Sequence, residues 1–316
     1  MKSRLLVNLG LLALIAILAT VAIVKPGKKE VELSPLLAVD PQVLTRVTLQ
    51  NKETLVFEKQ NGQWHLTAPF AAPVNQVRIG QLLDVAKATT EASYPLKPDE
   101  AGQFGLDAPE AVLTLGDNSL QFGGTDPIKM RRYVRLGNTL HLVEDNFFHH
   151  LTASATDYVD KRLIPEGSRI QEIQLPGLKA LRNGEGHWTV EPASESSTDL
   201  AELASVWATS RAIDVKRMDP KVVGETIRIG LVEGAPIEFI ILKKSPELVL
   251  GRRDLGLQYE VTSETSRELL NQPKPKSQTP PANEPDGSED ETAEPHDDHD
   301  ESGESGEEDH EDGDEG

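Results

Sequence analysis

Asn61-Gly62-Gln63-Trp64-His65-Leu66 places an Asn-Gly pair between two runs in which apolar and polar residues alternate. Such a pair is the strongest short-range signal for a β-hairpin, because a tight primed turn needs positive φ at both central residues. Trp64 and Leu66 lie two residues apart and therefore share one face of the strand after the turn. The pattern predicts a hairpin with Trp64 in the core.

The same order of parts recurs at Asn183-Gly184-Glu185-Gly186-His187-Trp188-Thr189-Val190. Trp188 and Val190 again lie two apart, and a proline comes after each unit, Pro69 in the first and Pro192 in the second. Two hairpins of one design predict a tandem duplication in which Trp64 and Trp188 are equivalent and buried.

Each unit continues with an amphipathic helix, four short strands and a second helix. The first helix is predicted over 73–92 in the first unit and from 199 to about 214 in the second, where Asp199 and Glu202 have the spacing of a capping box. The predicted strands are 111–115, 119–122, 133–136 and 140–143, then 226–232, 237–242, 248–250 and 257–261. The closing helical pieces are 147–151 and 263–270. The predicted fold class is therefore α+β, with repeats of hairpin, helix, antiparallel meander and helix at 42–166 and 167–271.

The first 24 residues are predicted to be a membrane anchor. Leu5–Val24 carries no charge over 20 residues, and a helix of that length spans about 30 Å, the thickness of a bilayer core. Lys2 and Arg4 also suit a cleaved signal peptide. However, the apolar run exceeds the usual h-region of roughly 7–15 residues, and Thr20-Val21-Ala22 is a poor cleavage site. The pattern favours an N-terminal transmembrane helix that is not cleaved.

The orientation of this anchor depends on the size of the body that comes after it. Lys and Arg flank the segment on both sides, so the positive-inside rule barely discriminates. Long domains after an anchor translocate largely regardless of such charges, which predicts a body on the periplasmic side. Residues 25–41, with Pro26, Gly27 and Pro35, are predicted to be a linker.

Charge is unevenly distributed along the chain. The net charge is −20, and from Asn271 to the end there are 18 Asp and Glu against two Lys. The body therefore has only a small net charge, and neither part has the basic face that nucleic-acid binding requires. There is no cysteine, which excludes disulfides and thiolate sites. Residues 272–316 have almost no apolar side chain and are predicted to be a disordered acidic tail.

The predicted tail holds the only candidate metal ligands. His296, His299 and His310 lie among carboxylates, a donor set that suits Zn²⁺, Ni²⁺ or Cu²⁺. The alternative is a solvating, self-repelling tail without a site, because a disordered segment lacks the preorganisation of a rigid site. No cofactor and no catalytic residue is predicted, since no phosphate loop and no local signature of a nucleophile is present.

Other candidates favour structural roles. His65 and His187 each adjoin a tryptophan, so the alternation of a strand points them to solvent. His149-His150 are sequence neighbours and cannot both face one metal from one side of a helix. Gly123-Gly124 is predicted to be a turn. Phe104–Pro109 has two interpretations, a turn whose Phe104 and Leu106 fill the core, or a loop that docks a partner.

These residues together resemble the domain of unknown function 4340 family. The resemblance is carried by Trp64-His65-Leu66 with Pro69, Phe104–Pro109, Gly123-Gly124, Tyr133-Val134-Arg135 and Val159–Ile164. It is strong from Val43 to Pro165 and looser to Leu270, where the Phe-Gly-Leu turn is missing. The resemblance implies a bacterial envelope protein at the inner membrane, in some cases an auxiliary component encoded beside an ABC transporter. It implies no catalytic residues.

The sequence leaves three functions open. The first is a non-catalytic, membrane-anchored accessory or binding module for another membrane component, such as an ABC transporter. The second is a metal-binding or metal-buffering protein that acts through its tail. The third is an enzyme with an unrecognised site, which a pocket with converging polar groups and a perturbed titratable residue would favour.

Overall fold

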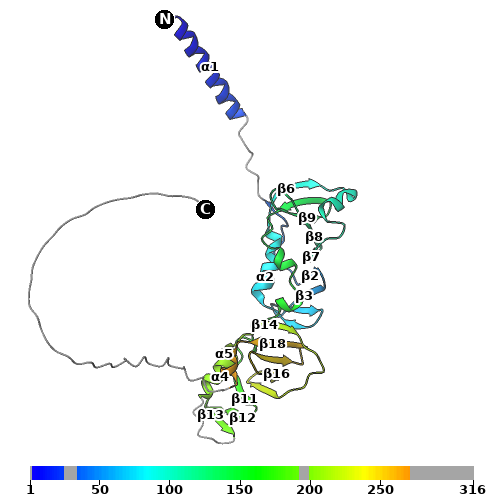
Figure 1. Ribbon diagram of the computed structural model, residues 1–316, viewed down its shortest axis with the longest axis vertical. Coiled ribbons are helices and arrows are strands. Elements are labelled where there is room, and N and C mark those ends of the chain that lie inside the picture. The colour runs from blue at the N-terminus through cyan, green and yellow to red at the C-terminus, as the bar shows by residue number, and fades with distance from the viewer. Residues whose placement is uncertain (1, 25–33, 192–198, 271–316) are drawn as a thin grey trace, which may run out of the picture. The chain divides into compact units, whose positions relative to one another are not determined.

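The computed structural model describes residues 2–24, 34–191 and 199–270 (Figure 1). Within these residues the chain forms two antiparallel sheets, one of ten strands and one of eight. All of the described residues fall within one compact unit of the chain. Residues 25–33 of the predicted linker and the predicted tail at 272–316 lie outside the described residues.

The first sheet, sheet 1, has the order β1-β6-β10-β9-β8-β7-β2-β3-β4-β5. Its strands are β1 (Ser34–Pro35), β2 (Arg46–Gln50), β3 (Thr54–Gln60), β4 (Gln63–Ala68), β5 (Ala72–Pro73), β6 (Thr89–Pro95), β7 (Ala111–Leu115), β8 (Asn118–Thr125), β9 (Arg132–Leu136) and β10 (Thr139–Val143).

The second sheet, sheet 2, has the order β13-β12-β11-β15-β16-β17-β18-β14. Its strands are β11 (Ile170–Leu175), β12 (Leu178–Arg182), β13 (Trp188–Glu191), β14 (Asp214–Arg217), β15 (Thr226–Leu231), β16 (Ile237–Lys243), β17 (Leu248–Arg252) and β18 (Leu257–Val261).

The two sheets share one topology. Without its short strands β1 and β5, sheet 1 runs β6-β10-β9-β8-β7-β2-β3-β4. Sheet 2, taken from its other end, runs β14-β18-β17-β16-β15-β11-β12-β13. The strands therefore correspond one to one, with β4 equivalent to β13 and β6 equivalent to β14. Because of this equivalence, the free edges of the two sheets can be compared directly.

In the described residues after Val24, the helices are few and short. The α-helices are α1 (Lys2–Val24), α2 (Gln76–Asp84), α3 (Phe148–Leu151), α4 (Leu200–Thr209) and α5 (Ser263–Leu269), and the 3₁₀ helices are η1 (Val85–Lys87), η2 (Pro98–Phe104) and η3 (Ala155–Tyr158). No helix in the described residues has the length and apolar character needed to cross a bilayer, which is the finding against the predicted transmembrane helix at residues 1–24. The predicted class, α+β with that helix and two repeats of hairpin, helix, antiparallel meander and helix, is wrong, because the described body is mainly antiparallel sheet.

The long helix predicted over 73–92 shows why the helical content is lower. Asn75 caps α2, and its side chain accepts hydrogen bonds from the amides of Val77 and Arg78 at 3.0 and 3.2 Å. The helix ends at Asp84, and the chain re-enters the sheet as β6 at Thr89. Pairing of β6 with β10 thus overrides the apolar periodicity at the end of the predicted helix. The second helix behaves similarly, since α4 ends at Thr209 and β14 comes next.

Only one of the two Asn-Gly turns is the predicted tight turn. Asn61 and Gly62 have φ of 50° and 81°, as a primed two-residue turn requires, and they join β3 to β4. Between β12 and β13 the loop is longer, and the positive φ falls on Gly186 instead. The Asn183 side chain there accepts hydrogen bonds from the amides of Glu185 and His187. The prediction of a second tight turn is wrong because this asparagine closes a wider loop.

Two main cores hold the body together. One packs α2 and α3 against sheet 1, and the other packs α4 and α5 against sheet 2. Trp64 is buried with 6% exposure, as predicted. Trp188 is only half-buried, so the prediction for it is wrong, because β13 is a short strand at the edge of sheet 2. The last part of the predicted linker belongs to the folded body, since Leu36 lies in the core of sheet 1.

Candidate functional site

A groove lies on the face of sheet 1 that points away from α2, near β6. Val134 packs in the core beneath α2, so its neighbour Tyr133 points to the opposite face. Two pockets of about 300 and 550 Å³ meet there and share Tyr94 and Leu142 in their walls. We call this surface the outer groove, and its main residues are Tyr94, Leu96, Phe104, Ile128, Tyr133, Leu140 and Leu142.

One wall of the outer groove is the 3₁₀ helix η2 and the turn after it. Gly105 ends η2 with a left-handed φ of 68°, and the amide of Leu106 then donates to the carbonyl of Ala101 at 3.0 Å. This turn buries Leu106 in a small cluster with Leu140. It also brings Phe104 against Tyr133, with the ring centroids 4.9 Å apart.

The other wall is the loop between β8 and β9. The Asp126 carboxylate accepts from the amide of Lys129 at 2.7 Å, and the Asp126 amide donates to the carbonyl of Arg131 at 2.7 Å. Met130 takes a positive φ of 56°, which is uncommon for a side chain of its size. This tightly bonded loop holds Ile128 in solvent with 87% of its surface exposed, and Met130 is exposed beside it.

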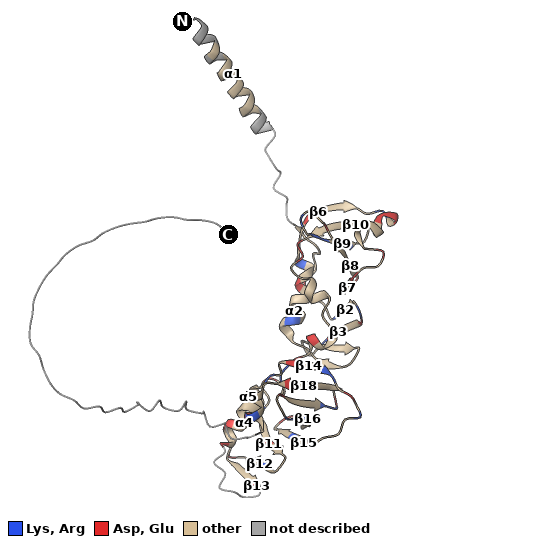
Figure 2. Ribbon diagram, in the orientation of Figure 1, with Lys and Arg blue, Asp and Glu red and all other residues tan. Residues whose placement is uncertain are grey.

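Charges around the outer groove are mostly paired. Glu91 on β6 forms ion pairs with Arg131 and, at 4.0 Å, with Lys129. Burial and the nearby Asp126 carboxylate raise the pKa of Tyr133, which keeps its phenol protonated. Over the described body, Lys and Arg lie interspersed with Asp and Glu (Figure 2). The groove therefore selects for apolar contact rather than for one sign of charge.

Arg132 supports the base of the β8–β9 loop from inside. Its buried guanidinium donates to the carbonyl of Gly123 at 2.6 Å and to the Asp145 carboxylate at 2.7 Å. It also lies over the Phe148 ring, 3.4 Å from the centroid. A buried charge is tolerated only with such partners, so these contacts fix where β8, β9 and the segment before α3 meet.

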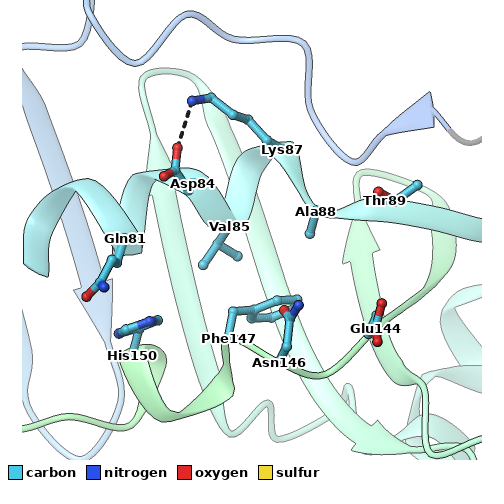
Figure 3. A pocket seen from close by; sticks show the side chains of 10 residues that line it. All are labelled: Gln81, Asp84, Val85, Lys87, Ala88, Thr89, Glu144, Asn146, Phe147 and His150. Carbon is cyan, nitrogen blue, oxygen red and sulfur yellow. Dashed lines mark hydrogen bonds and ion pairs between the residues drawn. The ribbon is translucent and has the colours of Figure 1, made fainter.

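A separate pocket, of about 440 Å³, lies between the end of α2 and the segment before α3 (Figure 3). Phe147 and Val85 form its apolar part, and Asp84 pairs with Lys87 at 2.7 Å within its lining. Burial, then His149 and Arg78, lower the pKa of His150, so its ring is neutral near pH 7. No group of three or more His, Asp or Glu side chains in the described residues is placed to hold a metal ion. No such group therefore lines this pocket.

The sequence profile of a domain of unknown function, DUF4340, matches residues 64–230, more than half of the chain. The chain belongs to the DUF4340 family. Nothing matches it among curated proteins or among solved structures. The DUF4340 match runs from β4 in sheet 1 to β15 in sheet 2, and it includes the outer groove.

Several residues that carry the DUF4340 resemblance pack onto one another. Gly123 and Gly124 lie within β8, so the predicted turn there is wrong. The Phe104 turn lies so close to the strand that a Cβ on Gly123 would be 2.2 Å from the Phe104 carbonyl oxygen. A glycine is needed for this close approach. Of the two interpretations of Phe104–Pro109, the structural one fits the burial of Leu106, and through Phe104 the turn also forms a wall of the outer groove.

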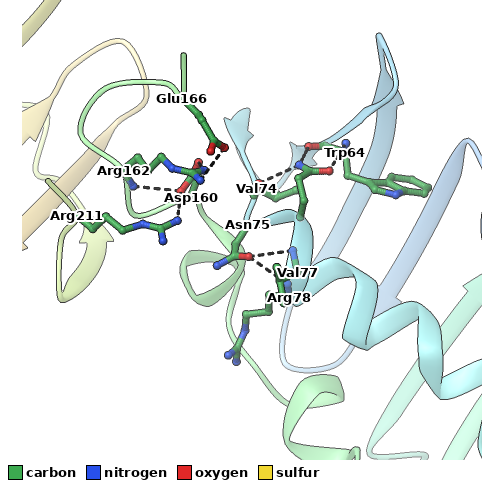
Figure 4. A network of polar contacts seen from close by, with 10 residues as sticks. Trp64, Val74, Asn75, Val77, Arg78, Asp160, Arg162, Glu166 and Arg211 are labelled. Atoms are coloured by element: carbon green, nitrogen blue, oxygen red, sulfur yellow. Dashed lines mark hydrogen bonds and ion pairs between the residues drawn. The ribbon is translucent and has the colours of Figure 1, made fainter. Parts of the chain in front are cut away.

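Another DUF4340 segment, Val159–Ile164, joins the two sheets (Figure 4). Val159 forms a β-bridge with Val74, which follows β5 of sheet 1. Arg162 forms one with Arg211, which precedes β14 of sheet 2. Asp160 lies between two guanidinium groups, 3.0 Å from that of Arg162 and 3.7 Å from that of Arg211. Arg162 also pairs with Glu166 at 2.7 Å. One carboxylate therefore links the connecting segment to sheet 2.

We expect Asp160→Asn to lower the free energy of unfolding by about 1–3 kcal/mol, since it removes the charge that two guanidinium groups share in a mostly buried position. Urea titration followed by circular dichroism measures this change. Glu166→Gln is the matched control, because Glu166 pairs with the same Arg162 but is 77% exposed. It should change stability by less than about 0.5 kcal/mol. Equal effects would show that Asp160 does not join the sheets.

The candidate histidines lie in different environments. His65 is half-buried beside Trp64, and its Nδ1 lies 3.2 Å from the Gln63 carbonyl. His187 is exposed. His296, His299 and His310 lie outside the described residues, so metal binding by the tail stays a prediction. The outer groove was not predicted, although two apolar residues in a polar turn, Ile128 and Met130, were a signal for it.

Proposed function

We propose that this protein is a non-catalytic accessory module of the bacterial envelope that binds another protein through the outer groove. The observation that carries the proposal is the exposure of Ile128 on a loop held by its own hydrogen bonds. Next to it, Tyr94 leaves 53% of its surface in solvent. Contiguous apolar and aromatic surface with a polar rim is typical of protein-binding sites.

We further propose that the partner is a membrane component such as an ABC transporter, met on the periplasmic side of the inner membrane. The support is the family resemblance, which implies in some cases an auxiliary component encoded beside such a transporter. The neutral, aromatic character of the outer groove suits an apolar segment of a protein better than a charged small molecule.

A photo-reactive phenylalanine analogue at Ile128, in the full chain in its native cells, tests the proposal. We expect one dominant cross-linked adduct, whose partner mass spectrometry identifies as an envelope membrane protein. Val223 is the matched control, because it is an aliphatic side chain with a similar exposure of 82% that lines a different pocket, outside the outer groove. The same adducts from both positions, or none from Ile128, would contradict docking at the outer groove.

A further inference from the structure

We infer that the partner binds as an extended segment that adds a strand to the free edge of β6. The inference rests on the proposed function and specifies how the outer groove is used. β6 pairs with β10 from Thr90 to Pro95, but β1 pairs with β6 only at Thr89 and Thr90. In the part of the chain that the structure describes, Glu91–Pro95 therefore has no strand on its outer side.

The ladder shows which backbone groups of β6 are free. The amide of Leu96 donates to the carbonyl of Asn138 at 2.9 Å, at the start of the β6–β10 pairing. Hydrogen-bonded and non-hydrogen-bonded pairs alternate along an antiparallel ladder. Tyr94 and Ala92 therefore direct their amides and carbonyls to β10, and Ser93 directs its own outward. Pro95, which has no amide hydrogen, also lies at an outward position, as edge prolines do.

The equivalent edge of sheet 2 is already an interface within this chain. There β14 corresponds to β6, η3 lies against β14, and just before this strand the amide of Ala212 donates to the carbonyl of Lys161 at 2.8 Å. Lys161 donates to the carbonyl of Ile213 just before β14, and the Arg217 guanidinium lies 3.9 Å from the centroid of the Phe70 ring. In sheet 2, this edge is therefore already used for contact with another part of the chain. In sheet 1, β1 covers only Thr89 and Thr90 of the β6 edge and Glu91 pairs with Arg131, and the rest of this edge has no strand beside it within the described residues.

The outer groove offers pockets at the spacing of a strand. Ala92 lines one pocket, and Tyr94 lines both. Residues two apart on a strand share a face and lie about 6.6 Å apart, so alternate side chains of an added strand would meet successive pockets. Main-chain hydrogen bonds then supply affinity, and the pockets supply specificity. The partner segment should be extended and should carry apolar side chains at every second position, with no fixed charge.

A fluorescent synthetic peptide of alternating Val and Thr, flanked by Lys for solubility, is the probe, and anisotropy with the full chain gives its Kd. Ser93→Pro removes the outward amide and should weaken binding tenfold or more. Ser93→Ala keeps the amide and should change binding less than twofold. Thermal unfolding of both variants shows whether the fold is kept.

Peptides that are N-methylated at every second residue test the wild-type chain without any substitution. Methyl groups on the amides that face β6 should abolish binding, and methyl groups on the other set should leave most of it. Equal effects of the two sets, or no binding of the peptide, would overturn strand addition. No binding is also the expected result if the chain's own residues before Ser34 occupy the edge. If the chain self-associates and Ser93→Pro abolishes this association, the β6 edge binds a second copy of the chain. That result would overturn the proposal that a different protein binds there.

The two proposals can fail separately. If Ile128→Asp weakens peptide binding while Ser93→Pro has no effect on it and the two sets of methylated peptides bind equally, the outer groove binds the peptide without strand addition. If the methylated sets discriminate but cross-linking from Ile128 finds no envelope partner, the edge is a strand acceptor and the proposed function is wrong.

Discussion

Trp64→Ala should lower the free energy of unfolding by about 3–5 kcal/mol, the usual loss when a buried Trp is truncated. Trp64 lies in the core of sheet 1 with α2, and its ring is covered on one side by Lys59 at 5.8 Å. The Gln76 side chain also bonds its backbone, since Oε1 accepts from the Trp64 amide at 3.0 Å and Nε2 donates to its carbonyl at 2.9 Å. Urea titration of the full chain measures the loss.

Trp188→Ala is the matched control, because Trp188 holds the corresponding place in sheet 2 but is only half-buried. Its loss should be no more than about half that of Trp64, since the energy scales with the apolar area removed from water. Equal losses for the two variants would contradict the different burial of the two strands.

Gly123→Ala should be the most damaging single-methyl change in sheet 1. The added Cβ would meet the Phe104 carbonyl oxygen at 2.2 Å and the Leu106 side chain at 3.1 Å. Overpacking of this kind costs about 1–3 kcal/mol and more when backbone must move, as it must here. The displaced turn carries Phe104, so the change should also open the outer groove. Thermal unfolding and the affinity of the alternating peptide measure the two effects.

Gly124→Ala is the matched control for Gly123→Ala, because it should not lower the free energy of unfolding. A Cβ on Gly124 would be 3.8 Å from the Phe104 oxygen, an ordinary contact. A glycine inside a strand is less stable than alanine by roughly 0.5–1 kcal/mol, so this variant should be neutral or slightly more stable. Destabilisation by both variants to the same extent would mean that the Phe104 turn does not rest on Gly123.

Strand positions were largely predictable from the sequence. The predicted run 111–115 is β7, and 257–261 is β18, because alternation of apolar residues reports directly on a half-buried strand. The Asp199 cap was also predictable, since its side chain accepts from the amides of Ala201 and Glu202. These features depend on local chemistry alone.

Features that depend on tertiary contact were missed. Residues 89–92 were predicted as the end of a helix, yet they belong to β6 (Thr89–Pro95) because they pair with β10. Gly123-Gly124 has the composition of a turn, yet it stays in β8 because another segment packs on it. The α+β class failed for a related reason, since the helices predicted at 73–92 and 199–214 end early and β6 and β14 begin within those ranges.

The outer groove could not be assembled from sequence, because it joins three distant segments. Tyr94 comes from β6, Phe104 from η2, and Ile128 from the β8–β9 loop. The sequence showed Tyr94 and Ile128 as isolated apolar residues, which are normal on a surface, and it offered docking as only one interpretation of Phe104–Pro109. Their convergence on one face depends on the strand order of sheet 1.

Amide hydrogen exchange of β6 in native membranes, compared with the purified full chain, tests the central claim most directly. The proposed strand addition predicts that the segment 89–95 exchanges more slowly in the membranes, because the outward Ser93 amide gains a partner there. The central strand β7 (Ala111–Leu115) should exchange equally in both, since it already lies between β8 and β2. Equal exchange of β6 in the two samples would contradict a partner strand at this edge.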